Sequence, residues 1–400
     1  DFDINNARLV TIATRICVRY ECVPMRFIKH VYKIHTYAQD GCLFEGKTPV
    51  SAFLNSSYDG SFIAGLMELR YIQSLPVERI INYFESHGFT LKKPTAHKLM
   101  EKASSLFENL YKCIRQTALS DPYKAADETY YKILVPEKNS KGKGVRKGYL
   151  WVVVGINTRM IYLLYDDGSR SEKVILNELG GCKGIIQSDG YSPYRKLESD
   201  AYPHITRIPC LQHIKRKFID CGEDDPDAKR IVEMINTLYQ NEHKHKIGVD
   251  GWTVEQNLVH RKKYAPDILG EIKDVLDDIE ERGDLLPKSE LKEAITYLRN
   301  EWNAVVDIFN YGDTYLDNNI VERMNRYISL SRKNSLFFGS HKGAERGAIL
   351  YTIALTCRMN KVNLFEYLTD IINRTAEWQP NTPLEKYRQL LPDRWEKAND

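Results

Sequence analysis

Three acidic side chains occur where an α/β fold would bring carboxylates together. Asp127 lies at the start of the first predicted strand in AADETYYKIL, Asp189 follows the short apolar run GIIQS, and Glu322 lies at the start of a predicted helix in DNNIVER. Ligands and catalytic groups gather where the strands of an α/β sheet end. A helix that crosses those ends can add a third carboxylate, so we expect one shared site.

The chemistry of such a site follows from its charge. Three converging carboxylates repel one another unless a cation lies between them. Mg²⁺ prefers oxygen ligands and usually takes only one or two carboxylates while keeping water and phosphate oxygens. Two such ions about 3.5–4 Å apart stabilise the attacking and leaving oxygens of an in-line phosphoryl transfer. The three residues therefore predict metal-assisted phosphodiester chemistry.

Each carboxylate also has a purely structural alternative. Asp127 is suited to capping a turn before its strand, and Asp189-Gly190 is a common turn dipeptide. Asn319 and Glu322 have the spacing of a capping box, in which Asn caps the helix and Glu lies three residues on. The catalytic interpretation therefore depends on all three carboxylates meeting in one place.

Other polar groups lie beside these carboxylates in the sequence. Cys210 and His213 in CLQH have a spacing that puts both on one helical face, where a metal-binding or functional role competes with a structural one. Arg suits bidentate phosphate contacts and Lys acts as a point charge. Such contacts would be salt-dependent and blind to sequence, whereas the alternative is ordinary solvated surface. The basic candidates for DNA contact are Lys215, Arg216, Lys217, Arg323, Arg326, Arg332 and Lys333.

The elements that must position these residues follow from the hydrophobic pattern. Residues 56–119 show helical periodicity, including a second helix that ends at His87-Gly88, and suit either a helix-turn-helix unit or a helical packing domain. Three strand-like runs come next, joined first by a basic, Gly-rich hairpin loop and then by a tight turn, and they are followed by helix, strand, helix and strand up to Cys210. This order predicts a ribonuclease-H-like α/β core, a mixed sheet with helices on both faces. Residues 222–302 read as a helical insertion before the last helix of that core.

Composition sets limits on the function. The 57 Lys and Arg against 54 Asp and Glu give a net charge of only +3, which by itself does not indicate a nucleic-acid binder. Residues 222–290 hold 10 basic and 17 acidic side chains, so the rest of the chain holds 47 basic against 37 acidic ones. We therefore expect a basic core and an acidic insertion. No apolar run approaches the roughly 18 residues of a membrane helix, and the first residues lack the pattern of a signal peptide.

The eight cysteines are scattered and form no CxxC pair, which favours reduced thiols over a disulfide framework. Near the N-terminus, Cys17, Cys22 and Cys42 are either ordinary thiols or part of a zinc module, although their spacing fits no standard zinc pattern.

Several segments in unbroken order carry a resemblance to a known family. From about residue 45 to the end, the chain resembles transposases of the insertion-sequence-66 family, which belong to the DDE transposases. The segments that carry the resemblance are ADET (126–129), GYLWVVVG (148–155), QSDGYSPY (187–194), CLQHIKRKF (210–218), LDNNIVER (316–323), SRKNSLFFGS (331–340), AGLMELRYIQSLPVERI (64–80), LYTIALTCRMNKVNLFEYLTDII (350–372) and LLPDRW (390–395). The sequence departs from the family in two places. It has no N-terminal CPxC, so the resemblance implies that Cys17, Cys22 and Cys42 are at most a remnant of the family's zinc-binding segment. CLQH replaces a Cys-Trp-Ala-His motif.

The resemblance implies a function and a set of partners. It implies that Asp127, Asp189 and Glu322 form the catalytic triad and bind Mg²⁺, with Mn²⁺ as a substitute. Water would first cut the end of a transposable element, and the freed 3′-hydroxyl would then attack target DNA, with no covalent protein–DNA intermediate. The expected partners are transposon-end and target DNA, further copies of the chain and accessory proteins of the element. The expected location is the bacterial cytoplasm, at the nucleoid.

These observations give a division of the chain and two rival functions. The rivals are a truncated or inactive transposase relic that binds DNA without cutting it, and a stand-alone nuclease on the same core. The expected parts are an N-terminal segment (1–45), a helical DNA-binding domain (46–120), the first part of the core (121–221), the helical insertion (222–302), the last part of the core with the Glu322 helix (303–360) and a C-terminal segment (361–400).

Overall fold

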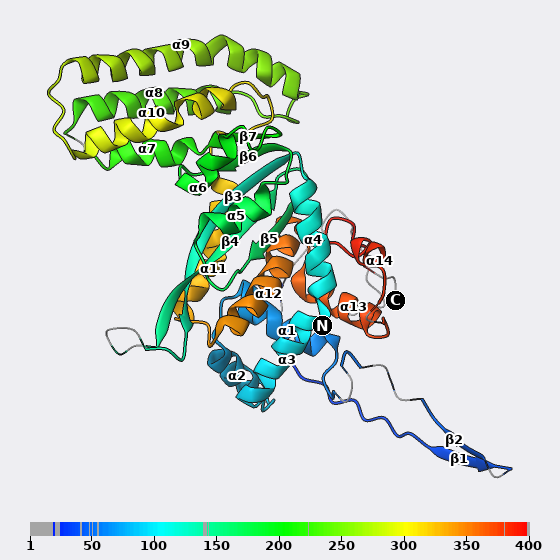
Figure 1. The fold of residues 1–400 in the computed structure, drawn as a ribbon. Coiled ribbons are helices and arrows are strands. Elements are labelled where there is room, and N and C mark those ends of the chain that lie inside the picture. The colour runs from blue at the N-terminus through cyan, green and yellow to red at the C-terminus, as the bar shows by residue number, and fades with distance from the viewer. Residues whose placement is uncertain are drawn as a thin grey trace, which may run out of the picture.

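A five-stranded sheet forms the centre of the molecule (Figure 1). The computed structural model describes residues 19–20, 25–40, 42–47, 49, 51–53, 56–138, 142, 144–222, 224–379 and 381–397. The strands are β3 (Tyr123–Leu134), β4 (Val145–Gly155), β5 (Met160–Leu164), β6 (Gly184–Ser188) and β7 (Ile205–Pro209). Their order in space is β5-β4-β3-β6-β7.

The sheet is mixed, as the sequence predicts. The strands β3, β4 and β5 are antiparallel neighbours, whereas β6 lies parallel to both β3 and β7. Parallel pairs need a crossover connection. That role falls to α5 (Glu172–Leu179) before β6, and to α6 (Ser192–Arg195) with the short helix η4 (Lys196–Glu198) before β7. The chain therefore has a mixed α/β architecture.

The first strand begins earlier than its sequence pattern suggests. Because β3 starts at Tyr123, Asp127 is its fifth residue, and the prediction that Asp127 lies at the strand start is wrong. The sequence pattern misses the first residues of β3 because they include a lysine, Lys124, a residue type that is rarely buried. In the structure Lys124 is fully buried. The ammonium group of Lys124 donates to the main-chain oxygens of Asp121 and Lys183, which offsets the cost of burial.

The edge strand β5 is covered by α12 (His341–Met359). The hydroxyl of Thr352 accepts a hydrogen bond from the main-chain N–H of Leu163 (2.9 Å), and the hydroxyl of Thr356 donates to the carbonyl of Ile161 (2.8 Å). An exposed strand edge invites pairing with other chains, and these two threonines occupy part of it. The C-terminal segment continues as α13 (Leu364–Thr375) and α14 (Leu384–Arg388).

The helices before the sheet share its apolar core. They are α1 (Gly60–Met67), the π-helical turn η3 (Glu68–Ile72), α2 (Val77–Ser86), α3 (Lys93–Leu106) and α4 (Glu108–Ser120). As predicted, α2 ends at His87-Gly88, where Gly88 takes a φ of +81° that suits glycine. The hydrophobic pattern of residues 94–119 predicts one helix, but the structure has two, with the buried Phe107 between them. Buried residues such as Ile63, Ile80 and Leu110 belong to the same core as the sheet.

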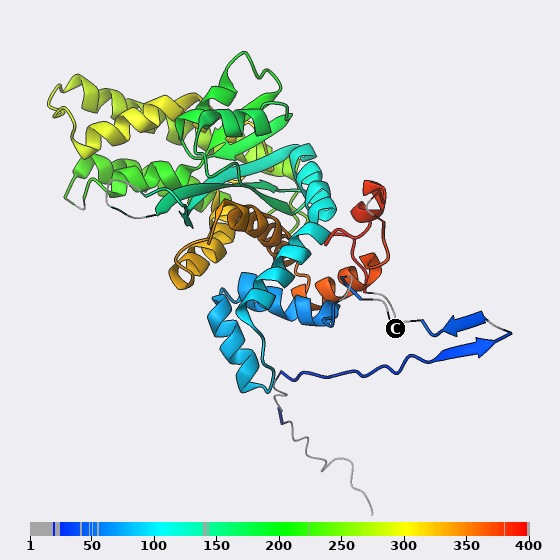
Figure 2. The same cartoon turned by 60° about the horizontal axis from the view of Figure 1, so that its bottom comes forward.

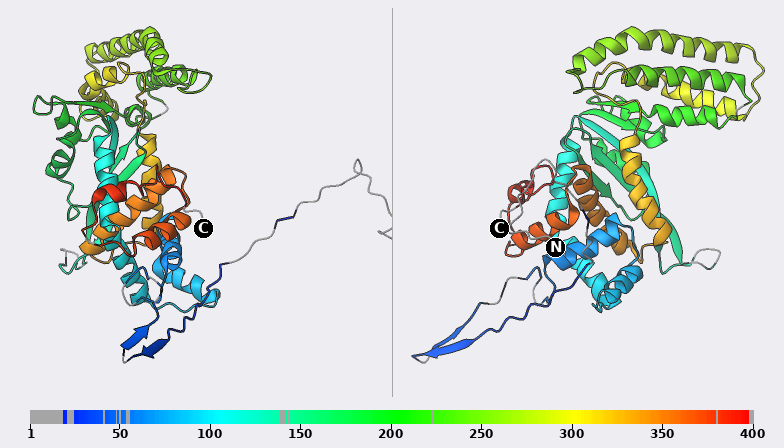
Figure 3. Two further views of the ribbon diagram at one scale, coloured as in Figure 1. Left: turned by 90° about the vertical axis from the view of Figure 1, so that its right-hand side faces the viewer. Right: turned by 180° about the vertical axis from the view of Figure 1, so that it is seen from behind.

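A group of long helices lies at the other end of the molecule, side by side in Figures 1 and 3. They are α7 (Leu211–Ile219), α8 (Pro226–His243), α9 (Val254–Glu281) and α10 (Glu290–Ile308). The pattern suggests a helix that begins at Pro266, but α9 begins twelve residues earlier. A capping box between Thr253 and Gln256 sets that start.

The hairpin of β1 (Thr36–Gln39) and β2 (Cys42–Glu45) projects away from the body of the molecule (Figure 2). Its residues are exposed, Cys42 among them. The other two cysteines of the zinc-remnant hypothesis, Cys17 and Cys22, lie outside the described residues. In the part of the chain that the structure describes, every helix is too short or too polar to cross a membrane.

Candidate carboxylate site

The two predicted aspartates are neighbours on adjacent strands. In the parallel pair of β3 and β6, Ala125 lies opposite Gln187. Two residues further along both strands, the same register sets Asp127 opposite Asp189, which directly follows the last residue of β6. The two carboxylates therefore meet at the carboxyl end of β6, where an α/β sheet gathers its functional groups.

The helix α11 (Asn319–Asn334) crosses the sheet at this point. Nδ2 of Asn325 donates to Oδ2 of Asp127 at 2.7 Å, while the other carboxylate oxygen of Asp127 accepts the N–H of Glu128 at 2.8 Å. Asn325 lies three residues after Glu322, so both side chains share one face of the helix. Because Asp127 lies inside β3, the alternative in which it caps a turn before the strand is wrong.

Burial and neighbouring charge act together on Asp127. Burial is the larger cause, followed by the nearby carboxylates of Glu128 and Asp189, and together they raise the pKa of Asp127 to about 8. The hydrogen bonds from Glu128 N–H and Asn325 oppose this rise without cancelling it. The site therefore holds more negative charge than its protein partners compensate, and its oxygen donors suit a hard divalent cation.

Glu322 lies in the first turn of α11 and does not cap it. The N-cap is Asn318, which makes no side-chain capping bond, so the capping-box alternative for Asn319 and Glu322 is wrong. Instead, Oε1 of Glu322 lies 3.7 Å from Nε2 of His213. The side chain of Glu322 is directed toward Cys210 and His213, so the structure brings the predicted cysteine and histidine to the third predicted carboxylate.

Cys210 connects the start of α7 to the start of α11 through a hydrogen bond. Its thiol, at the N-cap of α7, accepts the main-chain N–H of Asn318 at 3.2 Å. The side-chain amide of Asn318 in turn donates to the carbonyl of Ala126 at 3.0 Å. These two bonds connect the beginning of the Glu322 helix to both α7 and β3. Burial raises the pKa of the Cys210 thiol to about 12.

The turn that holds Asp189 is supported by the helix α10. Asp189 accepts the N–H of Tyr191 at 3.1 Å, so the structural turn role predicted for Asp189-Gly190 is present as well. The hydroxyl of Tyr297 accepts the N–H of Gly190 at 2.8 Å, and a Cβ at residue 190 would come within 2.4 Å of that hydroxyl. Glycine is therefore required here by the close approach of Tyr297.

A buried ion-pair network also contacts the turn that holds Asp189. The guanidinium of Arg207 is fully buried, pairs with Glu198 and Glu301, and donates to the carbonyl of Asp189 at 3.2 Å. Glu301 belongs to α10 and lies far from Asp189 in the sequence. Sequence reasoning missed this network because nothing in the local pattern marks a charged residue as buried.

A fourth carboxylate was also missed. Glu128 follows Asp127 on an extended strand, so its side chain points to the opposite face of the sheet. There it pairs with Arg170 at 2.5 Å and accepts a longer bond from the hydroxyl of Tyr194 at 3.4 Å. Alternation along a strand could have separated the roles of Asp127 and Glu128, and the three-residue spacing could have found Asn325.

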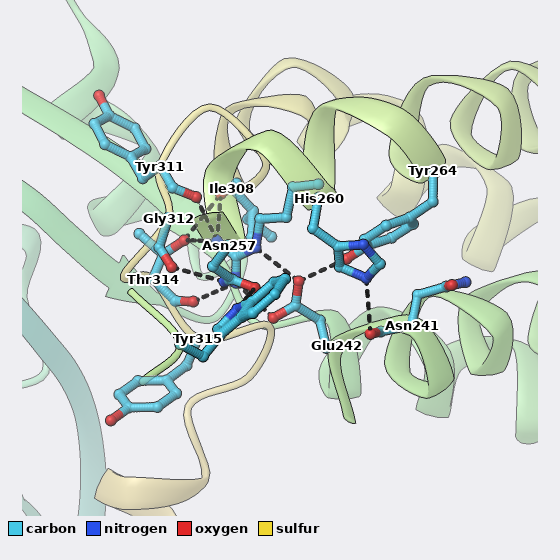
Figure 4. Close-up of polar contacts among 12 residues, drawn as sticks. Asn241, Glu242, Asn257, His260, Tyr264, Ile308, Tyr311, Gly312, Thr314 and Tyr315 are labelled. Carbon is cyan, nitrogen blue, oxygen red and sulfur yellow. Dashed lines mark hydrogen bonds and ion pairs between the residues drawn. The ribbon is translucent and has the colours of Figure 1, made fainter. Parts of the chain in front are cut away.

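The helices α8, α9 and α10 form a helical block, which holds the loop that leads into α11 (Figure 4). Arg261 of α9 is 1% exposed and pairs with Glu242 of α8 at 2.7 Å. Its guanidinium also donates to the carbonyls of Ile308 (3.2 Å), Tyr311 and Thr314, and to the hydroxyl of Thr314.

A second contact fixes the same loop. Asn257 donates to the carbonyl of Gly312 at 2.7 Å, and a Cβ at residue 312 would come within 2.1 Å of the carbonyl of Val254. The start of α9 thus packs directly on the loop, at a place where only glycine fits. Because the loop continues into the Glu322 helix, the helical block restrains the third carboxylate from a distance.

The predicted DNA-contact residues fall into two groups. Six are exposed or partly exposed and form no ion pair with any other described residue, namely Lys215, Arg216, Lys217, Arg323, Arg326 and Lys333. Arg332 differs, because its guanidinium lies 3.9 Å from the centre of the Tyr130 ring and donates to the Tyr130 carbonyl at 2.6 Å. Arg332 therefore has a structural role on β3.

Comparison with known proteins places the chain in a family. A family model described as "Transposase IS66 family" matches residues 55–346. Three similar proteins of Sinorhizobium fredii (strain NBRC 101917 / NGR234) are described as uncharacterized proteins y4jD, y4hP and y4qI, and they are 25%, 23% and 26% identical to this chain. The matches cover 83%, 98% and 92% of this chain, but 65%, 73% and 69% of those proteins. Since the family model spans most of the chain, including all three predicted carboxylates, the chain belongs to the IS66 transposase family.

Proposed function

We propose that the chain is a DDE-type DNA transposase, in which Asp127, Asp189 and Glu322 cut the ends of a transposable element and join them to target DNA. One observation carries the proposal. The parallel register of β3 and β6 sets Asp127 opposite Asp189, and α11, which bears Glu322, contacts Asp127 through Asn325. Membership of a transposase family supports DNA as the substrate.

The side chains around the triad have distinct tasks in this proposal. Asn325 holds Oδ2 of Asp127, which leaves the carboxylate in one orientation. Tyr297 and Arg207 fix the turn that carries Asp189. The uncompensated charge at Asp127 fits Mg²⁺ or Mn²⁺, which Asp127 and Asp189 would hold together with Glu322 once the Glu322 side chain turns away from Cys210 and His213. Such an ion would stabilise the attacking and leaving oxygens of phosphoryl transfer.

We further propose that the sheet is a ribonuclease-H-like core. Its first three strands form an antiparallel unit, and its last two are added in parallel beside the first strand, which is the order expected for such a core. In the proposed division of the chain, residues 121–221 and 303–360 form this core, residues 222–302 form an insertion, and residues 46–120 with the exposed basic side chains contact DNA. Joining two ends also calls for at least two copies of the chain.

A DNA cleavage assay tests the proposal. The protein is incubated with labelled element-end DNA in Mg²⁺ or EDTA, beside Asp189→Ala and the exposed control Asp200→Ala. We expect the parent and the control to cut and join DNA only with Mg²⁺, and Asp189→Ala to bind DNA without chemistry.

Other outcomes would favour the rival functions. Binding without cleavage under every condition would support the inactive relic and contradict the enzyme. Cleavage of unrelated DNA with no strand joining would instead support a nuclease.

A further inference from the structure

The side chains of Cys210, His213 and Glu322 form a compact cluster of unlike metal ligands. One ligand atom from each lies within 4.8 Å of the other two. Cys210 and His213 lie at the start of α7, and Glu322 lies in the first turn of α11, so two helix ends meet at the cluster. Among the described residues it is the one group of three or more Cys, His, Asp and Glu side chains with this spacing.

Two atoms of the cluster lack the partners that burial demands. Nδ1 of His213 and Oε1 of Glu322 are both inaccessible to solvent, and neither has a hydrogen-bond partner. The other ring nitrogen of His213, Nε2, lies 3.7 Å from Oε1 of Glu322, which is too long for a hydrogen bond. Unpaired buried polar atoms are costly and rare. The cluster brings a ring nitrogen of His213 and a carboxylate oxygen of Glu322 to the buried sulfur of Cys210, so a ligand bound there would meet side chains with unused polar atoms.

The donor types indicate what that ligand is. One sulfur, one imidazole nitrogen and one carboxylate oxygen form a set typical of zinc, whereas Mg²⁺ selects oxygen donors alone. Sites with three protein ligands leave a fourth position open for water or a substrate atom. We propose that Cys210, His213 and Glu322 bind a zinc-class transition-metal ion at the edge of the carboxylate site. On binding, the thiol gives its proton to solvent and the sulfur coordinates as thiolate.

This site would compete with the proposed chemistry for Glu322. A zinc ion held by Cys210 and His213 would keep the Glu322 carboxylate beside them, where it could not join Asp127 and Asp189 on Mg²⁺. We therefore expect stoichiometric Zn²⁺ to inhibit Mg²⁺-dependent cleavage. This consequence rests on the proposed function, whereas metal binding itself does not.

Cobalt binding tests the site without any activity. The full chain with Cys17, Cys22 and Cys42 changed to Ser serves as the parent, so that these thiols cannot contribute. Titration of this parent with Co²⁺ is expected to give a near-ultraviolet thiolate-to-cobalt charge-transfer band at one equivalent, and Zn²⁺ should abolish it. Cys210→Ser should remove the band and weaken Zn²⁺ binding at least about tenfold, whereas Cys221→Ser, which lies outside the cluster, should change neither.

Further variants separate loss of the site from loss of the fold. His213→Gln keeps a polar side chain of similar size and is expected to weaken Co²⁺ binding while the thermal unfolding temperature stays near that of the parent. A band that persists in Cys210→Ser, or the absence of any band in the parent, would overturn the proposal.

The inhibition assay gives an independent result. In the Mg²⁺ cleavage assay, Zn²⁺ should inhibit the parent, and Cys210→Ser should resist that inhibition. A cobalt band in a chain that never cuts DNA would uphold the metal site and refute only the transposase activity.

Discussion

The ionised carboxylate of Asp127 lowers the stability of the metal-free protein, because burial and nearby carboxylates disfavour its charge. Its pKa of about 8 lies above the ordinary value of 3.8 for an aspartate. The unfolded chain therefore releases this proton at lower pH than the folded chain does. By linkage, the contribution of Asp127 to stability falls as the pH rises from about 4 to about 8 and then levels off. A bound cation would relieve the effect of this burial and like charge, as the proposed function requires.

We predict that Asp127→Asn raises the thermal unfolding temperature of the metal-free protein. The amide removes the charge that burial and Glu128 disfavour, so the gain should be a few degrees, about 2–5 °C, at pH 8 and smaller at pH 5. Thermal unfolding in EDTA at both pH values measures this. Asp200→Asn, at an exposed position, should show no such difference. A variant that is less stable than the parent at pH 8 would contradict this account of Asp127.

The sequence predicts single residues whose type and spacing suggest chemistry. It does not predict residues whose role comes only from contacts made in the folded chain. The ends of predicted strands led to Asp127 and Asp189, the start of a predicted helix led to Glu322, and helical spacing led to Cys210 and His213. Asn325 and Arg207 escaped because an amide on a helix and an arginine on a strand look like surface residues. Their importance comes from partners far away in the sequence, which no local pattern reveals.

At the scale of elements, the helical block restrains the start of the Glu322 helix. Arg261 in α9 donates hydrogen bonds to carbonyls at the end of α10 and in the loop before α11. Tyr297 and Glu301 in α10 support the turn that holds Asp189. The block was expected as an insertion from its charge and periodicity. Its contacts to the loop were not foreseeable, since they depend on how α9 begins, and the pattern suggested a start at Pro266.

We predict that Arg261→Met destabilises the protein strongly. The change leaves the half-buried Glu242 without its arginine partner and several loop carbonyls without a donor. Breaking a buried pair costs about 3–5 kcal/mol. Chemical denaturation followed by circular dichroism measures the loss. The neighbouring Lys262→Met removes an exposed amine that contacts Asn310 and should cost less than about 0.5 kcal/mol. Equal effects of the two substitutions would show that the buried pair does not hold the loop.

The whole molecule divides its charge unevenly. Residues 222–290 have a surplus of acidic side chains, whereas the remainder is basic. Arg323 and Arg326 are exposed and belong to α11, the helix that also contains Glu322. Neither arginine forms an ion pair with a described carboxylate. The backbone of a nucleic acid would therefore meet unpaired positive charge beside the carboxylate site and net negative charge on the helical block.

This distribution predicts which lysines and arginines control DNA affinity. Each phosphate contact contributes about 0.9 to the slope of log affinity against log salt. Arg323→Ala with Arg326→Ala should lower that slope by about 2 and weaken binding equally for element-end and unrelated DNA, as fluorescence anisotropy at several salt concentrations would show. The matched pair Lys262→Ala with Lys263→Ala, on the acidic helical block, should leave the slope unchanged. If Lys262→Ala with Lys263→Ala lowered the slope instead, DNA would lie across the helical block. The uneven charge of the molecule would then not determine where DNA binds.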